Sequence, residues 1–244
     1  MAPKFRAFLI HLTASGGMAL LTMCVVFCLW YPSPLAGAVG VAAITFVLLG
    51  VDVVIGPVLT LIVYKPNKPS LRFDLAVIVG LQLAAFGYGV WTLSEGRPVW
   101  LVFSVDQFEL VQSYQVDLRK ISQAKPAFRS LSWIGPQWAA AKRASTPEEK
   151  KAILLESLVA GVDIAQRPEQ YVPLEDQAAD IRRNSRPLED LSQYNSAQTL
   201  RHELKKWPEA DAFLPMMARV KPVTVLIHKE SAKIIAVVDL NPWL

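Results

Sequence analysis

One carboxylate and one amide stand out in the first ninety residues because they interrupt long apolar runs. Asp52 lies within Gly50–Pro57, about twelve residues or roughly 18 Å from the end of its apolar segment. A carboxylate at that depth in a bilayer is costly unless it is paired or protonated. Pro57 lacks an N–H, so it leaves the Val53 carbonyl unbonded beside the same point. Gln82 lies at similar depth in the next apolar segment and is the predicted hydrogen-bond partner, whereas His11 is predicted to lie too near the cytoplasmic face.

Three interpretations of this group, Asp52, Pro57 and Gln82, remain open. The first is that the polar side chains hold the apolar helices together. The second is a polar site that receives the transmembrane helix of a partner protein. The third is an intramembrane protease, which requires two carboxylates that share a proton. The remaining candidate carboxylate, Asp74, is placed at the water boundary beside Arg72, which disfavours the protease.

Elsewhere the chain lacks the residue spacings that are typical of catalytic or metal-binding sites. Cys24 and Cys28 lie inside an apolar run and are interpreted as small hydrophobic residues. The three histidines form no metal-binding pair, and no nucleophile elbow, phosphate loop or dinucleotide fingerprint occurs. Adjacent acidic residues, such as Glu175 and Asp176, are typical of a solvated surface. We therefore expect no catalytic residues, no metal and no cofactor, and a binding role rather than an enzyme.

The elements that carry these residues are three predicted transmembrane helices, at about residues 7–30, 35–64 and 75–93. Each is long enough to cross about 30 Å of hydrocarbon. The first follows a basic start and could be a cleaved signal peptide, but it is too long, and Trp30-Tyr31-Pro32 is typical of a membrane interface. We predict a transmembrane domain at 1–94 and a second domain at 95–244.

Charge predicts the orientation and argues against a nucleic-acid ligand. Residues 95–244 hold 20 Lys/Arg and 19 Asp/Glu, whereas the five basic residues before them lie in the N-terminal tail and the loop 65–72. The loop 31–35 has no charge. Positive loops stay in the cytoplasm, so the tail and the basic loop are predicted inside and residues 95–244 outside, in the periplasm of a Gram-negative cell. Nothing resembles a phosphate-binding face.

The second domain is predicted to be a small α+β unit. Residues 99–105 and 108–111 have the composition of strands, and residues 223–227 and 234–240 flank a polar turn in a hairpin pattern. A capping box at Thr146-Pro147-Glu148-Glu149 predicts a helix that ends near Gly161, and residues 196–207 predict another. We expect a small sheet in which the first and last strands are neighbours. The overall expectation is a membrane protein with three transmembrane α-helices followed by a small α+β extracytoplasmic domain.

Several strings, in order along the chain, resemble the TfpX/TfpZ family of type IV pilin accessory proteins. They fall within residues 4–118 and comprise Trp30–Pro32, Leu48–Pro57, Leu61–Val63, Lys68–Ala76, Gln82–Leu83, Tyr88–Gly89, Arg97–Trp100 and Val105–Glu109. The resemblance implies an inner-membrane protein that associates with a cognate major pilin and assists its assembly. It implies no catalytic residues. The pilin helix of such systems carries a glutamate and a free amino terminus, which would be a counter-charge for Asp52.

The expected function is therefore that of an accessory protein in the bacterial inner membrane. Its expected partners are a type IV major pilin and the lipid bilayer, with no nucleic acid. The expected action is contact with pilin without catalysis. The alternative is a membrane enzyme that modifies pilin or envelope material, which the missing acid–base constellation disfavours.

Overall fold

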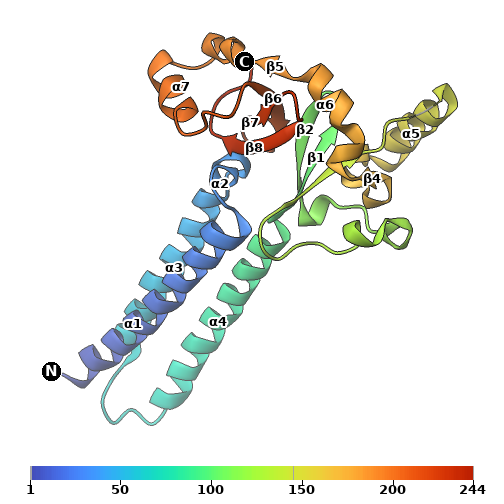
Figure 1. Cartoon of the computed structure of the whole chain (residues 1–244). Helices are drawn as coiled ribbons and strands as arrows, with labels where there is room; N and C mark the ends of the chain where they lie inside the picture. Colours follow the sequence, from blue (N-terminus) through green and yellow to red (C-terminus); the bar gives the residue numbers. More distant parts are fainter. Residues whose placement is uncertain (1, 145, 244) are drawn as a thin grey trace.

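The computed structural model describes residues 2–144 and 146–243, and three long helices dominate its N-terminal part (Figure 1). Helix α1 spans Pro3–Cys24 and continues as a π-helical segment, Val25–Trp30. Helix α3 spans Val41–Val63 and α4 spans Leu71–Glu95. These are the three helices in the described residues that are long and apolar enough to cross a membrane. Even α3, with 23 residues, is about 35 Å long, more than the hydrocarbon thickness of about 30 Å.

The three helices form a bundle in which α1 and α4 each pack along α3 and make few direct contacts with each other. Glycine permits close approach at one of these contacts, because a Cβ on Gly89 of α4 would meet the Leu48 side chain of α3. The N-terminus and the α3–α4 loop lie together at the end of the bundle far from the sheet (Figure 1). In that loop Lys68 forms an ion pair of 2.6 Å with Asp74.

The start of the predicted second span is not part of the long helix. Residues Leu35–Val39 form a separate short helix, α2, which ends at Gly40 in the left-handed region with φ of 72°. A Cβ on Gly40 would lie 2.8 Å from the Val220 side chain. The backbone N–H groups of Val220 and Lys221 both donate to the Ala38 carbonyl, at 2.9 and 3.2 Å. The α1–α3 connection is therefore bound to the β-sheet, and only a glycine fits the turn into α3.

The C-terminal part contains one sheet of eight strands within the described residues, in the order β4-β3-β1-β2-β6-β7-β8, with β5 paired to β6. The strands are β1 Pro98–Ser104, β2 Gln107–Gln112, β3 Gln137–Ala141, β4 Tyr171–Val172, β5 Arg186–Pro187, β6 Ala212–Met217, β7 Val223–His228 and β8 Lys233–Val238. Strands β7 and β8 form the antiparallel hairpin that the alternating pattern predicts. Strands β1 and β2, which their composition predicts as strands, also pair as an antiparallel hairpin.

The prediction that the first and last strands are neighbours is wrong. Strands β2, β6 and β7 separate β1 from the last strand, β8, and β2 pairs with β6 in parallel through Phe108 opposite Met216. Strand β6, Ala-Phe-Leu-Pro-Met-Met, contains a proline and no β-branched residue. Its composition therefore gives little strand signal, and its burial in the sheet is decided by its neighbours.

Helices and short turns connect the strands. Helix α5 spans Pro147–Ala160, α6 spans Ala178–Asn184 and α7 spans Ala197–Leu204. Thr146 caps α5 by accepting a hydrogen bond from the Glu149 N–H at 3.1 Å, and Ser196 caps α7 in the same way. Short 3-10 turns span Ser113–Gln115, Ile121–Gln123, Pro126–Phe128, Ile164–Gln166, Pro168–Gln170, Leu174–Gln177 and Leu188–Gln193. The chain is thus a membrane protein with an α+β domain after the three helices, as the sequence predicts.

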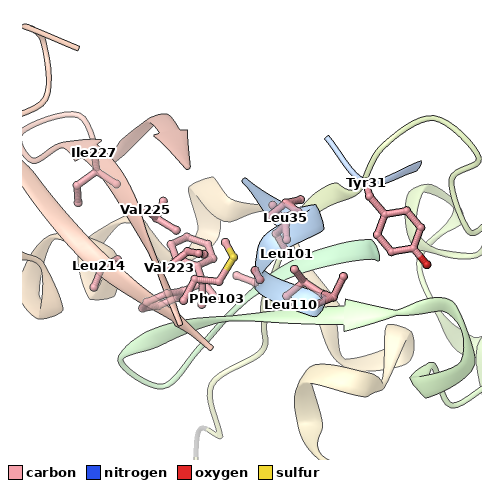
Figure 2. Packing of buried hydrophobic residues seen from close by; sticks show 14 of the residues in the cluster. Tyr31, Leu35, Leu101, Phe103, Leu110, Leu214, Val223, Val225 and Ile227 are labelled. Carbon is pink, nitrogen blue, oxygen red and sulfur yellow. The ribbon is translucent and has the colours of Figure 1, made fainter. Parts of the chain in front are cut away.

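The core of the sheet is continuous with the end of the helical bundle. Figure 2 shows Tyr31 and Leu35, from the end of α1 and from α2, in the same cluster as Leu101, Leu110 and Val225 from the strands. Tyr31 is 2% exposed, and its hydroxyl donates to the Leu93 carbonyl of α4 at 2.7 Å. Burial of these apolar side chains couples the sheet to the membrane helices, so the two parts are expected to keep a fixed relative orientation.

Candidate functional site

A network of polar side chains crosses the interior of the helical bundle. His11 of α1 contacts Thr60 of α3 through Nδ1, at 2.6 Å, and Gln82 of α4 through Nε2, at 2.9 Å. The Gln82 amide nitrogen donates to the Ser15 hydroxyl at 3.2 Å and to the Asp52 backbone carbonyl at 2.8 Å. The Gln82 amide of α4 therefore bonds to two side chains of α1 and to one backbone carbonyl of α3.

The donor and acceptor roles in this network follow from the partners. The Asp52 carbonyl can only accept, so the nitrogen of the Gln82 amide faces α3 and its oxygen faces His11. Nε2 of His11 then carries the proton, and in the neutral ring Nδ1 accepts from the Thr60 hydroxyl. A neutral histidine with both nitrogens bonded suits a bilayer interior, where an unsatisfied polar group is costly.

The sequence places His11 too near the cytoplasmic face to be the partner of Asp52, and His11 joins this group through Gln82 instead. Side chains on a helix lean toward its N-terminus, and the N-terminus of α4 is at the loop end of the bundle. Gln82 therefore reaches toward that end and meets His11. Ser15 and Thr60 were not anticipated either. The positions of His11 and Ser15 four residues apart, on one face of α1, were an available signal in the sequence.

Gln82 does bond to Asp52, but to its backbone and not to its carboxylate. The Asp52 side chain is 7% exposed, and its Oδ2 atom is buried with no hydrogen-bond partner among the residues that the structure describes. The amide also uses the Asp52 carbonyl rather than the Val53 carbonyl that Pro57 leaves without its usual donor. Gly56 makes this contact possible, because a Cβ there would collide with the Gln82 amide.

Asp52 and Gln82 line a cavity of about 430 Å³ between the three helices. Its polar lining consists of His11, Ser15, Asp52, Thr60 and Gln82, and its apolar lining of Ala7, Ile10, Ala14, Met18, Ala19, Leu49, Leu75, Val79, Leu83 and Phe86. Pro57 is buried in α3 but does not line it. Because α1 and α4 lie on either side of α3, the cavity is a largely apolar groove, and its wall contains the Asp52 carboxylate, whose Oδ2 has no hydrogen-bond partner among the described residues.

A second small pocket, of about 170 Å³, lies in the sheet domain beside Glu109 of β2. Burial first, and then the nearby Asp163, raise the pKa of the Glu109 carboxyl from 4.5 to about 7, against a hydrogen bond from Ser104 that lowers it. Arg219 and Met217 line the same pocket. The alternating pattern of β2 places Glu109 among buried neighbours, but only the parallel pairing with β6 covers it.

Known proteins resemble this chain along most of its length. The profile of the family described as "Fimbrial assembly protein FimB" matches residues 1–40. A "Fimbrial assembly protein, serogroup E1" from Dichelobacter nodosus is 30% identical over 242 residues, which cover 96% of this chain and 94% of that protein. The serogroup I protein of the same organism is 28% identical over the same shares.

A shorter relative, from serogroups C1 and C2 of Dichelobacter nodosus, is 33% identical over 117 residues, 47% of this chain and 89% of that protein. No solved structure matches. Because the serogroup E1 protein is similar over nearly the whole of both chains, helices and sheet domain included, the chain belongs to the fimbrial assembly protein family.

Proposed function

We propose that this protein is an accessory protein of the bacterial inner membrane that assists assembly of a cognate type IV pilin by contact and without catalysis. The names of its relatives in Dichelobacter nodosus support a role in fimbrial assembly. The resemblance of residues 4–118 to the TfpX/TfpZ proteins supports pilin as the partner. A pilin subunit before assembly has one apolar helix in the membrane and a head outside it, so a partner with three spans and an outer domain would meet both parts.

The observation that carries this proposal is the groove between α1 and α4. Ten of its fifteen lining residues are apolar, which suits a surface that receives a transmembrane helix. The carboxylate of Asp52 in its wall has a buried oxygen without a hydrogen-bond partner in the described part of the chain. A visiting helix that carries a donor or a positive charge at this depth would satisfy that oxygen, whereas a lipid acyl chain would not.

Photo-crosslinking tests the pilin contact directly. Leu83 and Leu81 lie on the same helix, α4, and both are exposed, but Leu83 lines the groove and Leu81 does not. A photoactivatable amino acid at position 83 is expected to crosslink to pilin in intact cells, because the groove holds the pilin helix. The same amino acid at position 81 is the matched control. Equal crosslinking at both positions, or none at 83, would contradict the proposed groove.

We propose further that the sheet domain lies in the periplasm. The basic tail and the α3–α4 loop, with Lys4, Arg6, Lys65, Lys68 and Arg72, are at the opposite end of the bundle from the sheet. Positively charged loops favour the cytoplasmic side. Alkaline phosphatase, which is active only outside the cytoplasm, is expected to be active when fused after Leu110 and inactive when fused after Lys68. The reverse pattern of activity would overturn this orientation.

A further inference from the structure

One loop of the sheet domain, between the turn Pro126–Phe128 and strand β3, reaches the end of the first transmembrane helix. The backbone N–H of Gly135 donates to the Leu29 carbonyl at 2.7 Å, and the Trp133 ring lies 6.3 Å from that of Trp30. Leu29 and Trp30 are the last residues of the apolar helix that spans Pro3–Trp30. The loop is therefore at the depth where that helix leaves the hydrocarbon.

The tip of this loop is apolar and uncovered. Trp133 is 59% exposed and Ile134 is 76% exposed. The backbone of Ile134 is nevertheless satisfied locally, since its N–H donates to the Ser132 hydroxyl at 3.1 Å and its carbonyl accepts from that hydroxyl at 3.0 Å. A loop tip that presents large apolar side chains, with the backbone of Ile134 bonded locally, is suited to a lipid environment and poorly suited to water.

Arg97 holds the loop against the end of α4. Its guanidinium lies 3.9 Å from the centre of the Trp133 ring, a cation–π contact. The same group donates through Nε to the Ser132 carbonyl at 3.1 Å and through Nη1 to the Ser94 carbonyl of α4 at 2.5 Å. Arg97 is 3% exposed, so these contacts are shielded from water. The position of the loop relative to the membrane helices is therefore fixed.

We propose that the loop 131–135 inserts into the headgroup region of the bilayer and anchors the sheet domain on the membrane surface. Aromatic side chains concentrate at this depth in membrane proteins. Trp91 of α4 is 57% exposed, and its ring lies 5.7 Å from that of Tyr88 at a tilt of 42°. It lies one turn before the end of its own helix and extends the same aromatic belt. The proposal requires that the three helices cross a membrane, and it does not depend on the contact with pilin.

A fluorescent probe tests this insertion in the full-length protein. In a C24S/C28S background, Ile134→Cys is labelled with an environment-sensitive dye and reconstituted into vesicles of phosphatidylethanolamine and phosphatidylglycerol. We expect emission at shorter wavelength than in water and strong quenching by lipids that carry a nitroxide near the headgroup. The side chain is mostly exposed, so labelling is not expected to change the melting temperature, which is measured in parallel.

The matched control is Val159→Cys on α5, an equally apolar and exposed position (88%) on a helix that projects away from the bundle (Figure 1). Its probe is expected to report water and no quenching by the nitroxide lipids. Two results would overturn the proposal. One is water-like emission at position 134. The other is a blue-shifted emission without quenching by shallow nitroxide lipids, which would mean that protein or deep hydrocarbon covers the loop.

Discussion

Asp52→Asn is expected to reduce surface piliation strongly while the protein remains inserted at its normal level. The substitution keeps the size of the side chain, and it leaves the network around Gln82 intact because that amide bonds to the backbone carbonyl of Asp52. What it removes is the negative charge that the carboxylate can take up when a visiting helix supplies a donor or a positive charge to Oδ2, which is buried without a partner among the described residues. A charge-assisted hydrogen bond contributes about 1.5–3 kcal/mol, so affinity for the visiting helix is expected to fall about ten- to a hundredfold.

The measurement is surface pilin together with the inner-membrane level of the variant. Asp74→Asn is the matched control, because Asp74 is also an acidic residue of the membrane helices and is paired with Lys68 at the loop end of α4. If cells with the Asp52→Asn variant have normal surface piliation at a normal protein level, Asp52 does not contact pilin and its role is in helix packing. Gln82→Leu is a different test: it breaks the contacts of α4 to both α1 and α3, and a lower protein level is expected.

The sheet domain is expected to lose stability as the pH rises from about 4.5 to about 7, because burial raises the pKa of Glu109 from 4.5 to about 7. Below this window the carboxyl is protonated in both the folded and the unfolded chain. Within it the folded chain keeps a proton that the unfolded chain has released, so the free energy of unfolding falls as pH rises. Above pH 7 the carboxyl is ionised in both states, and the total loss in the free energy of unfolding is about 3 kcal/mol or less.

Thermal melting of the full-length protein in detergent at several pH values measures this slope, and Glu109→Gln isolates the contribution of one residue. The amide is neutral throughout, so the variant is expected to melt higher than the parent protein at pH 7.5 and to show a flatter pH profile. Identical profiles for the two proteins would mean that Glu109 titrates in the folded state as it does in the unfolded chain.

Much of the architecture follows from the sequence alone because the forces involved are local or additive. Three long apolar runs become helices since a bilayer leaves no other partner for their backbone groups. Thr146 and Ser196 cap their helices through N–H groups only three residues away. The hairpin β7–β8 likewise follows from alternation on either side of a short turn. In each case the residues that determine the element are close together in the sequence.

Other features depend on which segments meet, and no local pattern contains that information. The buried strand β6 has a composition that suggests no strand, and it forms because β2 and β7 flank it. The interruption at Gly40 follows from the docking of Val220 against α2, almost two hundred residues later in the chain. The pKa of Glu109 depends on the same kind of long-range burial.

The candidate site likewise has features that the sequence predicts and others that only tertiary packing decides. The sequence identified Asp52 and Gln82, because a carboxylate and an amide inside apolar runs are costly wherever they lie. It also placed them at similar depth from helix rise alone. Which atoms are in contact depends on how the helices are rotated and offset relative to one another. In the structure the Gln82 amide bonds to His11, Ser15 and the backbone of Asp52. The carboxylate was left unpaired in the wall of the groove, because hydrogen bonds require contact at about 3 Å, and only tertiary packing sets distances on that scale.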